Sequence, residues 1–267
     1  KIRSLMEKKI LYLLTCVGLC WSSCTNEVDE FIGNVEPSTR SVSTALNANL
    51  ASLFTGGAPT LTSAEIKEVN DAYAKMTSIN CYRNIDEAVR NKTSYAGTIF
   101  LDDTYASAYF RKGSLAFPPY GILASSMEHE FIHMYQRDVQ GKKVDTDKEK
   151  RDTGMMEFEL AFYQGIIRYI HAGYSWTFKG EDGDPSYQSL WTSGLTDPSL
   201  IPQYEREFQT YVASICANGK PTSIDINEFV KWSNIFGEYS RGYSGKGYKF
   251  GNYDYGTSCI NSLLKLY

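Results

Sequence analysis

Residues 129–133 read His129-Glu130-Phe131-Ile132-His133 and contain two of the three histidines in this chain of 267 residues. Residues four apart on an α-helix lie one turn apart on the same face, so a helix here would bring both imidazole rings together. Phe131, Ile132 and the two residues that follow His133 carry no charge. The segment therefore predicts a largely buried helix over residues 122–140.

Two imidazole nitrogens on one helical face can bind a single zinc ion at about 2.0–2.1 Å each. Glu130 follows the first histidine directly, where it can reach a water molecule bound by that ion. In a chain with three histidines, such a pair with its glutamate arises by chance about once in a thousand sequences. The alternative is a helix whose histidines only pack in the interior or face solvent.

Over residues 94–172 the sequence resembles the HExxH zinc metallopeptidases, whose subgroups differ in the third protein ligand of the metal. The metzincin pattern requires glycine at position 136 and histidine at position 139. This chain has Gln136 and Val139 there, so that subgroup is excluded. The gluzincin pattern, with a glutamate on a downstream helix, remains.

A buried helix is predicted over residues 154–171, and it carries two candidate glutamates. Projected at 100° per residue, Glu159 lies inside the apolar face, whereas Glu157 lies nearly opposite it. Ala161, one turn after Glu157, would allow a close approach of the helix that carries the histidines. This favours Glu157, and Glu159 stays as the alternative, because a carboxylate on an apolar face needs a partner such as zinc.

The resemblance implies a Zn2+ cofactor bound by His129, His133 and Glu157, with Glu159 as the alternative third ligand. It implies that Glu130 is the catalytic general base, acting on a zinc-bound water to hydrolyse peptide bonds. The expected partners are extracellular peptides or proteins as substrates.

Two further features of the substrate site are predicted. Tyrosines in the aromatic loop 243–256 are candidate donors to the oxyanion: Tyr243, Tyr248, Tyr253 and Tyr255. The alternative is a surface loop with ordinary aromatic contacts. The resemblance also implies an edge strand that pairs with extended substrate, either residues 114–117 or residues 105–110.

His171 is the third histidine and ends the helix that carries Glu157. Fourteen residues of helix separate them by roughly 20 Å at about 1.5 Å per residue, so both cannot bind one ion. We expect His171 to stabilise the carboxyl end of that helix instead.

The first residues have the pattern of an export signal. A basic start is followed by an apolar run over residues 10–21, which is too short to span a membrane as a helix. Ser22-Ser23-Cys24 resembles the end of a bacterial lipoprotein signal, although Trp21 is larger than the residue usual there. The resemblance implies a signal peptide over residues 1–23, lipidation of Cys24 and anchoring to the bacterial outer membrane, facing the cell surface.

The fold class predicted for the rest is α+β. A polar tether covers residues 24–60, and a zincin-like core covers residues 61–172, with a small mixed sheet before the HExxH helix and the glutamate helix. Residues 173–267 form a mostly helical part that completes the cleft. Capping-box spacing at 62–65 begins a helix, and further helices are predicted at residues 85–90, 203–217, 224–240 and 258–266.

Composition limits the remaining function classes. The formal net charge is −4 and no basic stripe is present, so nucleic acid is not an expected partner. Aromatic residues make up 14% of the chain, with 20 tyrosines. The alternative function is therefore a non-catalytic surface lipoprotein that binds glycan or protein through aromatic side chains.

Overall fold

The computed structural model describes residues 45–56, 60–105, 107–142, 150–171, 173, 178–179, 185–186, 201–239, 248, 250–251 and 258–267. The chain divides into two compact units, Lys1–Tyr135 and Gln136–Tyr267. Both helices and a small sheet are present, which confirms the α+β class. No described helix has the length and apolar character needed to cross a membrane.

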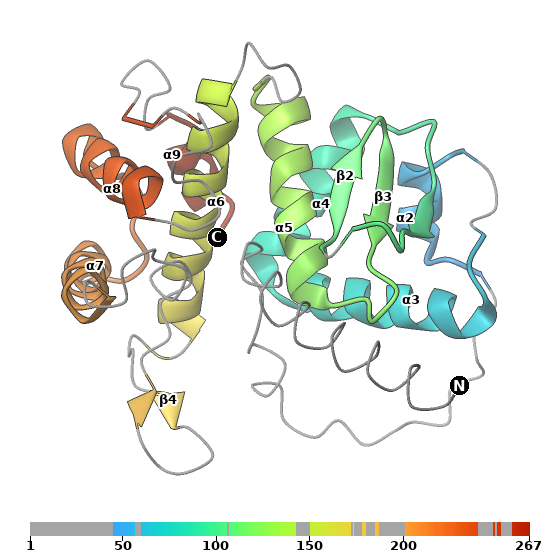
Figure 1. Ribbon diagram of the computed structural model, residues 1–267, viewed down its shortest axis with the longest axis horizontal. Helices are drawn as coiled ribbons and strands as arrows, with labels where there is room; N and C mark the ends of the chain where they lie inside the picture. Colours follow the sequence, from blue (N-terminus) through green and yellow to red (C-terminus); the bar gives the residue numbers. More distant parts are fainter. Residues whose placement is uncertain are drawn as a thin grey trace, which may run out of the picture. The chain divides into compact units, whose positions relative to one another are not determined.

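The first unit combines helices with a three-stranded sheet. Its described elements are α2 (Ala48–Leu53), α3 (Ser63–Ser78), α4 (Asn80–Lys92), β1 (Ile99–Leu101), β2 (Tyr109–Arg111), β3 (Ser114–Phe117) and α5 (Ala124–Met134). Helices α3, α4 and α5 pack on one another, and α5 also contacts β2 (Figure 1). Helix α4 corresponds to the helix predicted at residues 85–90 and extends beyond it at both ends.

The capping box predicted before α3 is confirmed. The Thr62 hydroxyl accepts from the backbone N–H of Glu65, and the Glu65 carboxylate accepts from the backbone N–H of Thr62. Without these bonds, the backbone N–H groups of Thr62 and Glu65 would be unsatisfied donors at the start of the helix. This reciprocal pair explains why α3 begins where it does.

Strand β3 lies at the centre of the described sheet. It pairs in parallel with β1 and antiparallel with β2, so the strand order is β1-β3-β2. Strands β2 and β3 form a hairpin, with Arg111 opposite Ser114. Because β3 is paired on both sides, the prediction of residues 114–117 as an edge strand is wrong, and β2 is the edge strand beside α5.

The hairpin turns over two residues with positive φ, Lys112 at 50° and Gly113 at 78°. Two-residue turns of this kind match the right-handed twist of the paired strands. Glycine adopts such angles at little cost, whereas lysine is strained there. The turn therefore fixes the register of β2 and β3 at some local cost at Lys112.

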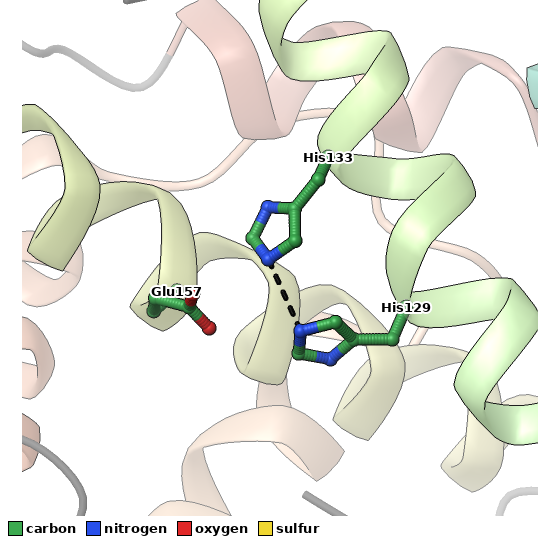
Figure 2. Close-up of side chains that lie close together, drawn as sticks. All are labelled: His129, His133 and Glu157. Carbon is green, nitrogen blue, oxygen red and sulfur yellow. Dashed lines mark hydrogen bonds between the residues drawn. The ribbon is translucent and has the colours of Figure 1, made fainter. Parts of the chain in front are cut away.

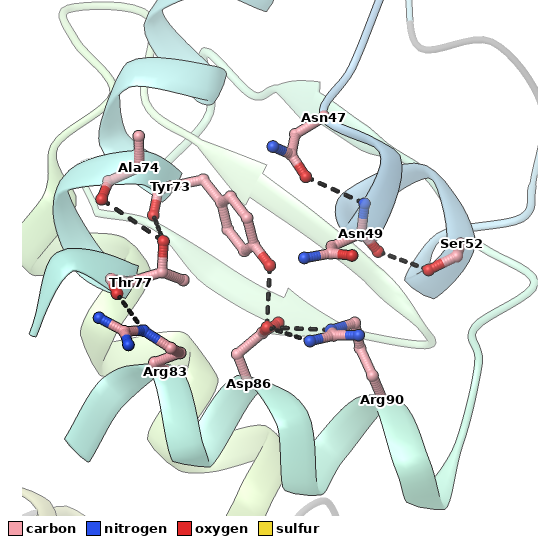
Figure 3. Close-up of polar contacts among 9 residues, drawn as sticks. All are labelled: Asn47, Asn49, Ser52, Tyr73, Ala74, Thr77, Arg83, Asp86 and Arg90. Atoms are coloured by element: carbon pink, nitrogen blue, oxygen red, sulfur yellow. Dashed lines mark hydrogen bonds and ion pairs between the residues drawn. The ribbon is translucent and has the colours of Figure 1, made fainter. Parts of the chain in front are cut away.

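A buried polar network joins α3 and α4 (Figure 3). Asp86, only 1% exposed, accepts a hydrogen bond of 2.8 Å from the Tyr73 hydroxyl and forms an ion pair of 2.9 Å with Arg90. Burial and the negative charge of Asp86 raise the pKa of Tyr73 above its ordinary value. The Tyr73 ring also packs on Phe131 of α5, with centroids 6.2 Å apart, so the network supports the helix that carries the histidines.

The second unit is mostly helical. The π-helical turn η2 (Tyr135–Val139) begins at the last residue of the first unit and continues into the second. The other described elements are α6 (Lys150–His171), β4 (Phe178–Lys179), β5 (Pro185–Ser186), α7 (Ile201–Ile215), α8 (Ile226–Tyr239) and α9 (Ser258–Lys265). Helix α6 contacts α7, α8 and α9 (Figure 1). Its buried aromatic core contains Phe158, Phe162, Phe208, Phe229, Trp232 and Phe236. The three predicted carboxyl-terminal helices are confirmed within two residues at each end.

The predicted helix over residues 122–140 changes character near its end. It is an α-helix to Met134 and continues as the π-helical turn η2. A π turn accommodates one more residue than an α turn, which shifts the face presented by the residues after it. Hydrophobic periodicity does not reveal such a turn.

Several predictions fall on residues that the structure does not describe. The signal peptide over residues 1–23, the lipidated Cys24 and most of the predicted tether lie outside the described residues. Within the tether range, α2 buries Leu50 and Leu53. The predicted domain boundaries at 60 and 172 stay predictions.

Candidate metal centre

The two histidines of α5 lie together, as the spacing predicts. Their Nε2 atoms are 3.1 Å apart, and the rings meet edge to face with centroids 4.7 Å apart (Figure 2). Both side chains are half-buried. Helix α5 holds them in place because its other faces are buried, with Met127, Phe131 and Ile132 completely so.

Glu157 on α6 completes a cluster with these histidines. One ligand atom from each of His129, His133 and Glu157 lies within 4.8 Å of the others. The Glu157 carboxylate faces the two rings in Figure 2. Glu157 is half-buried, like both histidines. Among the described residues this is the group of three side chains that could hold a metal ion.

Glu159, the other candidate, lies elsewhere. It is completely buried, and its Oε2 accepts a hydrogen bond of 2.6 Å from Nε2 of Gln136. It is not a member of the cluster. Glu157, which the sequence favours, is thus the glutamate that lies with the histidines. Glu159, on the apolar face, has Gln136 as its partner instead of a metal ligand set.

Glu130 is buried, at 5% exposure, beside the cluster. Its Oε1 lies 4.0 Å from Nε2 of His129. A carboxylate at this distance is adjacent to the metal-binding atoms without being one of them. The arrangement places a proton acceptor next to the position that an ion would occupy.

The remaining predicted residues lie apart from the cluster or outside the described residues. His171 is in the last turn of α6, and its Nε2 is 3.4 Å from the hydroxyl of Tyr267. His171 is exposed, and partial desolvation of its ring lowers its pKa. Tyr248 is half-buried and is not in the cluster, whereas Tyr243, Tyr253 and Tyr255 lie outside the described residues. No oxyanion donor is therefore assigned.

Gln136 is a residue that sequence reasoning missed as part of this region. It is completely buried and donates through Nε2 to both Glu159 and the carbonyl oxygen of Met156, 3.0 Å away. Gln136 lies in the π-helical turn η2, so α-helical periodicity gives no signal for its contacts.

Comparisons of the chain with protein-family models, with curated proteins and with solved structures gave no match. Any functional conclusion for this protein therefore rests on the geometry and chemistry of the cluster.

Proposed function

We propose that this protein is a zinc-dependent peptidase of the gluzincin type. The observation that carries the proposal is the convergence of His129, His133 and Glu157 with the buried Glu130 beside them. Two imidazoles and one carboxylate form a ligand set found in catalytic zinc sites, which keep a further position open. Glu130 in the spacing His-Glu-x-x-His separates this set from a simple structural site.

The distances in the cluster fit one ion. Two ligands at about 2.0–2.1 Å from a tetrahedral zinc are about 3.3 Å apart, and the two Nε2 atoms are 3.1 Å apart. Ligand atoms within 4.8 Å of one another need only a small side-chain adjustment of Glu157 to reach that spacing. The half-burial of all three limits competition from water while leaving access for a substrate.

In this proposal the roles of the side chains are distinct. His129, His133 and Glu157 hold the ion. When bound, zinc supplies Lewis-acid chemistry: it polarises a carbonyl group and lowers the pKa of a water at its open position. Glu130 accepts a proton from the attacking water and returns it to the nitrogen that leaves when the peptide bond breaks. Burial keeps the Glu130 carboxylate close to the His129 ring, so it needs little reorganisation.

Strand β2 is the proposed substrate-pairing element. It is one of the two edge strands of the described three-stranded sheet, and it contacts α5, the helix of the two histidines. An edge strand has backbone N–H and C=O groups that an extended peptide can pair with. This supports peptides in extended conformation as the substrate class.

The alternative function, binding of glycan or protein through aromatic residues, has limited support. Among the described residues, the exposed large hydrophobic side chains are Tyr105 and Tyr120, at 49% and 64% exposure. Most other described aromatics pack in the two cores. A binding role alone would not require the buried Glu130 next to paired histidines.

Metal analysis of the purified protein tests the first step of the proposal. We expect about one zinc per chain in the native protein and a loss of zinc in His129→Ala and His133→Ala. His171→Ala is the matched control, because it removes the third histidine far from the cluster, and it should keep the zinc. Equal zinc content in His129→Ala and the native protein would contradict the assignment.

Cleavage of a peptide library tests the second step. We expect hydrolysis that a chelator abolishes and that added zinc restores. A protein that binds zinc stoichiometrically but cleaves no peptide would contradict the peptidase function while leaving the metal centre in place.

The proposed location follows from the amino-terminal pattern. We infer that Cys24 is acylated and anchors the protein to the outer membrane. Cys24→Ala should abolish incorporation of labelled fatty acid and release the protein from the membrane fraction. Labelling that persists in this variant would contradict a lipid anchor at Cys24.

A further inference from the structure

Gln136 makes two hydrogen bonds that bracket Glu157 on α6. Its Nε2 donates to the carbonyl oxygen of Met156, at 3.0 Å, and to Oε2 of Glu159, at 2.6 Å. Met156 directly precedes Glu157, and Glu159 is two residues beyond it. One amide group therefore holds the helical turn that carries the carboxylate of the cluster.

Gln136 is also tied to the histidines by the chain itself. It lies three residues after His133, and the helical run is unbroken from α5 into η2. A short, continuous segment of helix thus connects His133 to the amide that contacts α6.

We propose that Gln136 and Glu159 are positioning residues that set the place of Glu157 relative to His129 and His133. This inference rests on the proposed metal centre. Gln136 and Glu159 touch neither the ion nor the substrate in this proposal. Their role is to hold the turn of α6 that carries Glu157 in a position where its carboxylate can bind the same ion as the two imidazole rings.

The energetic reason is that both partners are completely buried. A buried polar side chain costs free energy unless it is hydrogen-bonded, and this contact pairs two of them. The short Gln136–Glu159 contact therefore strongly favours one placement of the turn. Partners that orient metal ligands in this way affect metal affinity about 10–100-fold when they are removed.

Zinc affinity of the Gln136 and Glu159 variants tests the proposal. We would measure the zinc dissociation constant by competition with a chromophoric chelator, and the visible spectrum of the Co2+-substituted protein. Gln136→Asn keeps a buried amide but is one methylene shorter, so it cannot reach both acceptors. We expect its zinc affinity to fall about 10–100-fold and its Co2+ spectrum to change.

Glu159→Gln is the conservative variant, because its amide oxygen can still accept from Gln136. It should bind zinc within about threefold of the native protein, whereas Glu159→Leu should show the same loss as Gln136→Asn. A purely structural role would not produce this rescue. Gln136→Leu is informative only if it folds, so Gln136→Asn and Glu159→Gln carry the test.

Two controls separate positioning from general destabilisation. Gln203→Leu removes an exposed glutamine that bonds to Glu207 at 3.0 Å, and it should not change zinc affinity or the Co2+ spectrum. Phe162→Leu weakens the core of the second unit, and it should lower the thermal midpoint without changing the Co2+ spectrum.

The outcomes distinguish the two proposals. A folded Gln136→Asn protein with native zinc affinity and a native Co2+ spectrum would overturn the positioning role, and the metal centre would stand. A native protein that binds no zinc would overturn the metal centre and the positioning role together. Weakened zinc binding in Gln136→Asn with rescue in Glu159→Gln supports the positioning role whether or not peptide cleavage is found.

Discussion

Two buried carboxylates, Asp86 and Glu159, are 1% and 0% exposed but have different surroundings. Asp86 joins α3 and α4 through an ion pair with Arg90 and a hydrogen bond from Tyr73. Glu159 accepts from the neutral amide of Gln136, two residues from a member of the metal cluster. Similar burial thus joins two helices in one region, and in the other it accompanies the contact to which we assign a positioning role. Variants in the two regions should therefore affect different properties.

The largest expected effect is on turnover, in Glu130→Gln. Glutamine has nearly the same shape as glutamate but cannot accept the proton, so peptide hydrolysis should fall by about 10²–10⁴-fold while zinc stays bound. Steady-state kinetics and metal analysis measure the two properties separately. Glu68→Gln, on the exposed side of α3, is the control and should have native kinetics. Native turnover in Glu130→Gln would remove Glu130 as the base.

The next effect is on stability, in Asp86→Ala. Removing one member of a buried ion pair leaves Arg90 and Tyr73 without their partner, which should cost about 3 kcal/mol in the free energy of unfolding. Urea denaturation followed by circular dichroism measures this. Zinc affinity of the folded variant should not change, because none of these three side chains belongs to the cluster of His129, His133 and Glu157.

The matched control for Asp86→Ala is Asp71→Ala. Asp71 and Lys67 form an i,i+4 pair on the same unit, but both side chains are exposed. An exposed pair is screened by solvent, so its loss should leave the denaturation midpoint unchanged. The distinction between a scaffold carboxylate and a surface one would be lost if both variants had the same effect.

A smaller effect is expected in the hairpin turn. Lys112 has a φ of 50°, which asparagine adopts more readily than lysine. Lys112→Asn should therefore stabilise the protein by about 0.5 kcal/mol. The thermal midpoint should rise by about one or two degrees. A lower thermal midpoint in this variant would contradict the strain assigned to Lys112.

The smallest effect is a change in pH dependence at His171. Partial desolvation lowers the pKa of His171 from its ordinary value of 6.5 in the folded state. The unfolded chain therefore binds more protons below about pH 6.5, and this contribution to stability is lost as the pH falls through the lowered pKa. His171→Gln should flatten the fall in thermal midpoint between about pH 7 and pH 5. If the thermal midpoints of the native protein and of His171→Gln depended on pH in the same way at saturating zinc, this interpretation of His171 would be contradicted.

Much of the local structure could be predicted from the sequence. The capping box at Thr62 and Glu65, the hairpin around Lys112 and Gly113, and the helix of the HExxH motif each depend on residues within a few positions of one another. Local hydrogen bonds and periodicity decide such features, so short windows of sequence contain the necessary information.

Long-range pairing was predicted less well. The strand formers at 114–117 were recognised, but not that β3 lies between β1 and β2. The period of two along a strand shows which side chains share a face and not which strands lie on either side. The sequence therefore allows two segments as the edge strand, and the pairing of β3 on both sides excludes residues 114–117.

The sequence by itself determined that two imidazoles lie on one face of a helix with a glutamate next to the first, because helical geometry fixes neighbours four residues apart. Only the tertiary structure decided that Glu157 joins them and that Gln136 binds Glu159. These contacts join residues about 20 or more positions apart, so no short window of sequence contains both partners. Packing of buried side chains, which no local pattern encodes, sets those distances.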